Sequence, residues 1–268
     1  MNDLRDDIFK GVMHCSVTAV ILAEDAGVIA GTQDAVENAR SLGLVLLGML
    51  GEGKPVRKGE EVARISGNPK QIAMAEDLLI GLIAKPSGIA TAARKCVDMA
   101  GERIQIVCGA WKKMPSVLKE TIRKAVVTGG ACSRISNDPF IYLDKNYVRM
   151  LGGIRNSLKA VEHLAGYKKV VQINGSQTDI AMEACDAAEF KADIIFIDSG
   201  RTDDLITVVN VLNRKGLREK LRIAFGGNVK IEDIDWFKTT SVDILEIGRP
   251  IIDAPLLDLK LEVVEIRK

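Results

Sequence analysis

Apolar residues recur at two different spacings in the first third of this chain. Residues 4–13 and 34–43 carry an apolar side chain at every third or fourth position, which predicts two helices. Residues 16–24 are almost continuously apolar and rich in β-branched side chains, and shorter apolar runs follow at 45–50 and 60–67, which predicts strands. The pattern therefore favours a mixed α/β domain at the N-terminus.

The helical pattern resumes after these strands and meets Pro86. Proline has no amide to donate and its ring clashes with the carbonyl four residues earlier, so we expect the helix to break at Lys85-Pro86. We place the domain boundary at this break. Residues 1–84 then form the N-terminal domain, an α/β sandwich, and residues 85–252 form a second domain. The C-terminal segment 253–268 is expected to pack back on the first domain.

After this break, short apolar runs alternate with helical ones. The predicted strands are 103–110, 140–144, 168–174, 192–198, 221–227 and 242–248. Strands that alternate with helices predict right-handed βαβ units and a parallel sheet. So many units in one run favour an α/β barrel, with an open doubly wound sheet as the alternative.

Composition and charge narrow the function classes. Apolar residues make up 47% and charged residues 27% of the 268 positions, as in an ordinary globular protein. Thirty-seven basic and thirty-six acidic residues give a net charge of +1, so no overall field attracts nucleic acid or an anionic membrane. No apolar run approaches the ~20 residues that span a bilayer. We therefore expect a cytoplasmic protein without nucleic-acid or membrane partners, whose phosphate affinity is local.

The cysteines suggest neither a disulfide framework nor a zinc site. All five stand singly without a CxxC pair, and the chain has only two histidines. We expect buried free thiols. The five are Cys15, Cys96, Cys108, Cys132 and Cys185.

Candidate chemistry gathers where the last three predicted strands end. These ends carry Asp198, the pair Gly226 and Gly227, and Gly248. Active sites of parallel barrels lie at the carboxyl ends of the strands, and glycines there let backbone amides approach an oxyanion. The sequence therefore predicts a phosphate-binding mouth. The alternative is that the paired glycines only make a tight turn and that Asp198 caps a helix.

A second group of cations follows the first barrel strand. Lys112 and Lys113 come directly after it, and Arg134 follows a Thr-Gly-Gly turn. Ammonium and guanidinium groups make charge-assisted hydrogen bonds to phosphate, so these cations suit a polyanionic ligand. A solvated basic edge is the alternative, and the favoured one for Lys113. Trp111 either stacks on a planar ligand or packs in a core or interface.

In this order, the blocks SGIATAAR, TGGACSR, DIIFIDS, FGGN and VDILEIGRP resemble the quinolinate phosphoribosyltransferase family, also called nicotinate-nucleotide pyrophosphorylases. The resemblance covers nearly the whole chain. It implies an N-terminal α/β sandwich followed by an incomplete, seven-stranded parallel α/β barrel. It also implies a homodimer or a higher homo-oligomer with shared active sites. In the family dimer, the N-terminal domain of the partner caps the barrel mouth.

The resemblance also implies a reaction. In the family, phosphoribosyl pyrophosphate binds with Mg²⁺, the ring nitrogen of quinolinate attacks C1 of the ribose, and decarboxylation follows. Lys112, Asp198 and Glu246 are then the catalytic candidates, and Asp198 is also the candidate metal ligand. The residues expected to bind the phosphates are Lys112, Arg134, Gly226, Gly227, Asn228 and Gly248. Strand alternation places Glu246 on the face of Gly248 in the mouth, where it is either a source of negative charge or a core glutamate paired with Lys112.

Two positions of the expected acceptor pocket lack a family arginine. Asp77 stands where the family has the arginine that reaches a quinolinate carboxylate across the dimer. Trp111 replaces the arginine of the family's Arg-Lys-Thr motif, and Gly109 replaces the aspartate before it.

The rest of the expected acceptor pocket has changed as well. Ser133 stands beside Arg134 where a histidine is expected, and Asp144 occupies a lysine position with Lys145 next to it. Gln172 replaces one of two glutamates on a central strand. Each lost buried cation contact costs on the order of 1.5 to 3 kcal/mol. We therefore expect a phosphoribosyltransferase with a neutral or cationic acceptor other than quinolinate. The alternative is a catalytically silent homologue that binds a phosphorylated nucleotide-like ligand or a partner protein.

Overall fold

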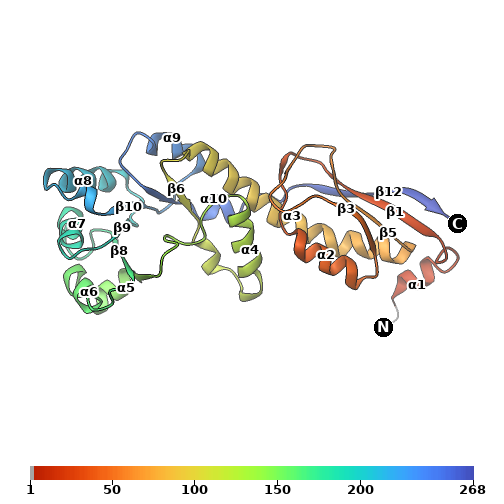
Figure 1. Cartoon of the computed structure of the whole chain (residues 1–268), viewed down its shortest axis with the longest axis horizontal. Coiled ribbons are helices and arrows are strands. Elements are labelled where there is room, and N and C mark those ends of the chain that lie inside the picture. Colours follow the sequence, from red (N-terminus) through yellow and green to blue (C-terminus); the bar gives the residue numbers. More distant parts are fainter. Residues whose placement is uncertain (1–2) are drawn as a thin grey trace. The chain divides into compact units, whose positions relative to one another are not determined.

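A computed structural model describes residues 3–268, which form two compact units (Figure 1). The first unit comprises residues 3–95, 113–130 and 251–268, and the second comprises residues 96–112 and 131–250. Within residues 3–268, no helix is both long and apolar enough to cross a lipid bilayer.

The first unit is built on a four-stranded antiparallel sheet. Its strands, in spatial order, are β12 (Leu259–Arg267), β1 (Ser16–Ala23), β5 (Glu61–Gly67) and β3 (Val45–Met49). Because side chains alternate across a strand, Ala19, Ile21 and Ala23 of β1 all face the core and are buried. The strands predicted at 16–24, 45–50 and 60–67 are confirmed. A short ladder joins β2 (Gly27–Val28) to β4 (Pro55–Val56).

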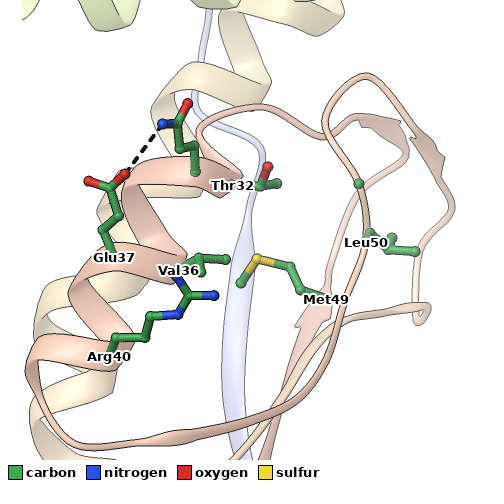
Figure 2. A pocket seen from close by; sticks show the side chains of 8 residues that line it. Thr32, Val36, Glu37, Arg40, Met49 and Leu50 are labelled. Atoms are coloured by element: carbon green, nitrogen blue, oxygen red, sulfur yellow. Dashed lines mark hydrogen bonds between the residues drawn. The ribbon is translucent and has the colours of Figure 1, made fainter.

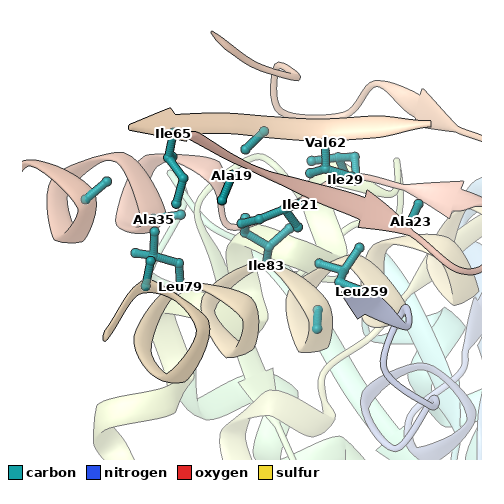
Figure 3. Packing of buried hydrophobic residues seen from close by; sticks show 14 of the residues in the cluster. Ala19, Ile21, Ala23, Ile29, Ala35, Val62, Ile65, Leu79, Ile83 and Leu259 are labelled. Carbon is teal, nitrogen blue, oxygen red and sulfur yellow. The ribbon is translucent and has the colours of Figure 1, made fainter. Parts of the chain in front are cut away.

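Helices cover one face of this sheet. Leu79 and Ile83 of α3 (Pro69–Ala100) and Ala35 of α2 (Thr32–Ser41) pack towards Ile21 and Ile65 of the strands (Figure 3). The unit also contains α4 (Ser116–Thr128) and α1 (Leu4–Ile8). Helix α1 ends earlier than the predicted 4–13, because the chain turns at Phe9 and Lys10.

The predicted helix break at Lys85-Pro86 is wrong. Pro86 lies inside the continuous helix α3. The proline leaves the carbonyl of Leu82 without its helical donor, and Gly31 packs so closely there that a Cβ on it would lie 2.0 Å from that oxygen. One turn later, the Ser87 hydroxyl accepts a hydrogen bond from the amide of Ala30 over 2.9 Å. These contacts hold a neighbouring segment against the helix on both sides of the proline, so the helix continues.

The second unit contains a six-stranded parallel sheet, and all six predicted strands are confirmed. In spatial order they are β6 (Gln105–Val107), β11 (Ile244–Glu246), β10 (Arg222–Phe225), β9 (Ile194–Ile197), β8 (Lys168–Ile173) and β7 (Phe140–Leu143). An isolated parallel bridge joins Cys132 to Val107 and occupies a seventh position beside β6.

Helices connect these strands, and Figure 1 shows α6, α7 and α8 along one side of β8, β9 and β10. The α-helices are α5 (Lys145–Met150), α6 (Ile154–Ala160), α7 (Ile180–Glu189), α8 (Thr202–Arg214), α9 (Ile234–Phe237) and α10 (Arg249–Ile252). Short 3₁₀ helices are η1 (Ala110–Lys113), η2 (Arg218–Lys220) and η3 (Ile231–Asp233).

The sheet curls into an incomplete barrel. One apolar cluster joins Val107 of β6 to Val170 of β8 and has Tyr142 of β7 packed against it. In a flat sheet of this strand order, β6 and β7 would lie about 24 Å apart, because neighbouring strands are about 4.8 Å apart. Lys112, shortly after β6, has its Nζ 5.6 Å from the ring centroid of Tyr142 on β7, so the two end strands approach each other and the open doubly wound alternative is excluded.

Candidate active site

Strand alternation brings several of the candidate residues to one end of the barrel. Val170, Phe196, Ala224 and Ile244 all lie in the interior cluster. The residues two positions further along these strands are Gln172, Asp198, Gly226 and Glu246. Because the strands are parallel, these residues meet at the carboxyl end. We call this end the barrel mouth, defined by Gly109, Lys112, Tyr142, Gln172, Asp198, Gly226 and Glu246.

The Gln172 amide bridges two strand ends in the mouth. Its Nε2 donates a hydrogen bond to Oδ2 of Asp198 over 2.6 Å, and its Oε1 accepts one from the amide of Lys145 over 3.0 Å. A carboxylate only accepts and an amide N–H only donates, so these two partners fix the orientation of the side-chain amide. Gln172 is 6% exposed, whereas Asp198 is open to solvent. Gln172 therefore holds one Asp198 oxygen in place at the solvent-exposed end of β9.

The glycines after β10 permit close packing. A Cβ on Gly226 would lie 2.8 Å from Cζ of Phe196, and one on Gly227 would lie 2.7 Å from the amide nitrogen of Gly200. Gly227 has φ +97°, and the next residue, Asn228, has φ +60°. These contacts require glycine at both positions even without a phosphate, so the predicted phosphate role rests on the exposed backbone around Asn228.

Glu246 lies beside two glycines of the mouth. Its Oε1 is 3.3 Å from the place that a Cβ on Gly109 would take, and its Cβ is 3.2 Å from the corresponding place on Gly226. The aspartate that the family resemblance leads us to expect at Gly109 would crowd Glu246. Gly248 lies two residues after the end of β11 and packs on Ala110, whose Cβ is 3.2 Å from where a Gly248 Cβ would be.

Lys112 extends over two aromatic rings. Its Nζ is 5.6 Å from the ring centroid of Tyr142 and 6.0 Å from that of Trp111, within the range of cation–π attraction. Trp111 is held in turn, because its Nε1 donates a hydrogen bond to the carbonyl of Ser133 over 3.0 Å. Sequence reasoning missed Tyr142. The available signal was its position two residues before Asp144 on a predicted strand, which places both on one face.

The environment of Tyr142 is apolar and negative. Burial raises the pKa of its hydroxyl, and the charges of Asp198, Glu246 and Asp144 raise it further. Burial likewise raises the pKa of the Cys108 thiol, to about 12, with a smaller contribution from Glu246. Three carboxylates therefore contribute to the field at the centre of the mouth.

The other candidate residues lie outside this centre. Asp144 caps α5, where its Oδ1 accepts hydrogen bonds from the amides of Asn146 and Tyr147 over 2.8 and 3.0 Å. Arg134 is exposed and makes no hydrogen bond or ion pair within the part of the chain that the structure describes. Asp77 belongs to the first unit, where it pairs with Arg5.

All five cysteines are free thiols, as expected. Four are buried, and Cys132 is half-buried.

The first unit has a hollow of its own, of about 430 Å³, between α2 and the chain around the end of β3 (Figure 2). Its lining residues are Thr32, Gln33, Val36, Glu37, Arg40, Met49, Leu50 and Gly51. The Gln33 amide donates to Glu37 over 3.3 Å at its edge. The sequence did not single out any of these residues.

Comparison with known families identifies both parts of the chain. The family model for the quinolinate phosphoribosyl transferase N-terminal domain matches residues 5–87, and the model for the C-terminal domain matches residues 89–262. The chain belongs to the quinolinate phosphoribosyl transferase family. This confirms the resemblance inferred from the sequence.

Relatives in this family match more than nine tenths of the chain. A probable nicotinate-nucleotide pyrophosphorylase (carboxylating) of Archaeoglobus fulgidus is 31% identical over 93% of this chain and 95% of its own. The protein of the same description from Methanothermobacter thermautotrophicus is 28% identical over 92% of this chain and 88% of its own. The fold is similar to the nicotinate-nucleotide pyrophosphorylase structure from Pyrococcus furiosus, with a TM-score of 0.84 at 20% identity, covering 99% of this chain and 75% of that one.

The mouth offers few ligands for a metal ion. Within residues 3–268, no group of three histidine, cysteine or carboxylate side chains gathers as a metal site. Mg²⁺ commonly binds through one or two carboxylates together with substrate phosphates. Asp198 is the solvent-exposed carboxylate of the mouth that would hold such an ion, with the diphosphate supplying the remaining oxygens.

Proposed function

We propose that this member of the quinolinate phosphoribosyl transferase family transfers ribose 5-phosphate to an acceptor whose heteroaromatic ring, with the groups attached directly to it, is neutral or cationic. The donor is phosphoribosyl pyrophosphate, and quinolinate is not the preferred acceptor. Phosphoribosyl transfer is supported by the family and by relatives named nicotinate-nucleotide pyrophosphorylase. The choice of acceptor rests on one observation, the three carboxylates whose charges reach Tyr142.

Charge opposes quinolinate in this mouth. Quinolinate carries two carboxylates and needs cations beside it, whereas the charges of Asp198, Glu246 and Asp144 all act on Tyr142. The mouth cation Lys112 lies over the same ring, and the diphosphate of the donor competes for it. The electrostatic repulsion between like charges in a partly buried site is on the order of several kcal/mol. A neutral or cationic ring instead gains from both the aromatic surface and the carboxylates.

In the proposed transfer, the basic residues bind the leaving group and the acidic residues stabilise the ribose. Lys112 and Arg134 bind the diphosphate, which departs with the electron pair of the bond to C1 of the ribose. The unprotonated ring nitrogen donates its lone pair to C1 and forms the new bond. Positive charge builds on the ribose between these events, and the carboxylates of Asp198 and Glu246 stabilise it. Mg²⁺ bound with the diphosphate would neutralise part of the leaving-group charge.

Acceptor binding uses the neutral groups. The exposed part of Trp111 and the Tyr142 ring offer stacking surfaces, and the Gln172 amide stays neutral where a glutamate would add a fourth charge. In the homodimer that the family resemblance implies, Asp77 would stand where the family arginine reaches the mouth, and because it pairs with Arg5 it offers no cation to a dianion. Every substitution at these positions thus moves the acceptor site away from a dianion.

Two neighbouring lysines provide the test. Isothermal titration calorimetry with phosphoribosyl pyrophosphate and Mg²⁺ is expected to show binding that Lys112→Ala weakens about tenfold or more, the value of one charge-assisted contact. Lys113→Ala, one residue along η1, removes the same charge outside the proposed contact and is expected to leave the affinity unchanged. Equal weakening in both variants, or no binding by the wild type, would contradict the proposal. Binding without pyrophosphate release for any acceptor would instead favour the silent homologue.

A further inference from the structure

A second hollow lies on the rim of the barrel, between the ends of β7 and β8. It has a volume of about 610 Å³. We call it the rim hollow, and its lining residues are Lys145, Asn146, Arg149, Asn174, Ser176 and Gln177. These side chains carry two full positive charges and several amide and hydroxyl donors, and none carries a negative charge.

The two cations of the rim hollow share one face of a helix. Lys145 and Arg149 are four residues apart on α5, so their side chains project in the same direction. Within residues 3–268 neither forms an ion pair, although most other arginines of the second unit have a carboxylate or carbonyl partner. The nearest carboxylate along the chain, Asp144, is occupied by the backbone amides of α5. The positive charge of the hollow is therefore not neutralised by the protein.

The opposite wall is a loop with a fixed shape. The Glu183 side chain is 2% exposed and accepts hydrogen bonds from four backbone amides of the loop at residues 174–178. Oε2 accepts from Asn174 and Gly175 over 3.0 and 2.8 Å, and Oε1 accepts from Gln177 and Thr178 over 2.9 and 3.5 Å. A buried carboxylate that organises a loop in this way leaves the loop's side chains, rather than its backbone, to meet a ligand.

The rim hollow is separate from the predicted phosphate site but linked to the mouth. Gly226 follows β10, whereas the hollow lies beside β7 and β8, so two strand spacings, about 10 Å, separate β8 from β10. The amide of Lys145 donates to Gln172, which in turn binds Asp198. The start of α5, which carries the two cations, is thus anchored directly to a residue of the mouth.

We propose that the rim hollow binds an oxyanion group, a carboxylate or a phosphate, carried on a substituent of the acceptor. The proposal rests on the proposed function for the identity of that ligand as the acceptor. It gives the acceptor two ends, a neutral or cationic ring in the mouth and an anionic group about one strand spacing away. Lys145 and Arg149 bind the anion by charge, and the side chains of Asn174 and Ser176 donate hydrogen bonds to it.

The test follows backbone amide NMR signals during titration with inorganic phosphate and, separately, with succinate, at constant ionic strength. Saturable shifts are expected at Lys145 and at residues 174–178 with at least one of the two anions, and the tighter of the two identifies the group. The double variant Lys145→Gln/Arg149→Gln is expected to bind about tenfold more weakly. A matched pair of exposed cations elsewhere in the second unit, Arg214→Gln/Lys220→Gln, is expected to leave the titration unchanged.

Two results would overturn the rim proposal. One is the absence of saturable shifts at residues 174–178 with both anions, and the other is an equal affinity in the Lys145→Gln/Arg149→Gln variant and the wild type. The amides of Gly226 and Gly227 report on the mouth in the same spectra. If phosphate shifts the amide signals of the mouth but not those of the rim hollow, only the rim proposal is rejected. If the anions shift the signals of the rim hollow while phosphoribosyl pyrophosphate leaves those of the mouth unchanged, the result supports the rim proposal and contradicts the proposed function.

Discussion

Gln172 donates a hydrogen bond of 2.6 Å to Asp198 at the centre of the barrel mouth. The contact joins the ends of two neighbouring strands, β8 and β9, and fixes one oxygen of the candidate metal and ribose ligand. A glutamate at position 172, as the family resemblance leads us to expect, would place two carboxylates in contact. The amide therefore sets both the geometry and the charge of the mouth.

Gln172→Glu should make stability depend on pH. Two carboxylates in contact cannot both stay ionised, so the pKa of the pair rises in the folded state. Because the pKa of the pair is higher in the folded than in the unfolded state, the unfolded chain releases the shared proton at a lower pH. Below about pH 4 the variant therefore has nearly the same free energy of unfolding as the wild type. As the pH rises towards 8, its free energy of unfolding falls about 1–3 kcal/mol below that of the wild type.

Urea unfolding at several pH values measures this effect. Gln105→Glu, at the opposite end of a barrel strand, adds the same charge without a facing carboxylate and serves as the control. An equal loss for Gln172→Glu at pH 4 and pH 8 would show that residue 172 does not face Asp198 in solution.

Glu183→Gln should loosen the loop that lines the rim hollow. An amide keeps one accepting oxygen, so at least one of the two pairs of loop amides loses its acceptor, at a cost of about 1–3 kcal/mol. Hydrogen exchange at residues 174–178 is expected to accelerate in this variant. Glu189→Gln, on the exposed side of the same helix, is the control, and equal exchange in the two variants would refute the role of Glu183.

Gly227→Ala and Gly216→Ala separate backbone strain from a clash. Both glycines have positive φ, +97° and +65°. A Cβ at 216 meets nothing within 4 Å, whereas one at 227 lies 2.7 Å from the Gly200 amide nitrogen. Gly216→Ala is expected to cost about 1 kcal/mol and Gly227→Ala about 3 kcal/mol or more in urea unfolding. Similar losses would mean that the loops after β9 and β10 do not pack as described.

Cys108 should resist alkylation in the folded protein. Burial raises its pKa to about 12, so at pH 8 its thiolate fraction is about a thousandfold below that of an ordinary thiol. Cys132, which is half-buried, is expected to react with iodoacetamide well before Cys108. Mass spectrometry of the cysteine peptides measures the order, and labelling of Cys108 first would be inconsistent with its burial.

The order of elements could be read from the sequence because each barrel strand is a short apolar run bounded by helical patterns. Alternation along those runs also placed Glu246 on the face of Gly248 and so in the barrel mouth. The family resemblance supplied the chemistry of the mouth, which periodicity alone does not contain. Pro86 was misread because a local rule for helix breaking omits the packing of Gly31 and Ser87, which is tertiary.

Other features could not be predicted because they join residues that are distant in sequence. Lys112 and Tyr142 are separated by a helix and a turn, and only barrel closure brings the ammonium group over the ring. Glu183 is one acidic residue in a helical stretch of the sequence, and its burial follows from the path of the loop before α7. Predicting either contact would require the three-dimensional course of the chain.

The most direct test of the central claim is pyrophosphate release from phosphoribosyl pyrophosphate and Mg²⁺ with quinolinate and with a panel of pyridines and azoles whose rings are uncharged or cationic, with and without an anionic side chain. The account predicts release with at least one acceptor whose ring is neutral or cationic, at a kcat/KM about a hundredfold or more above that for quinolinate, equivalent to about 3 kcal/mol. A preference for quinolinate over every other acceptor in the panel would contradict it.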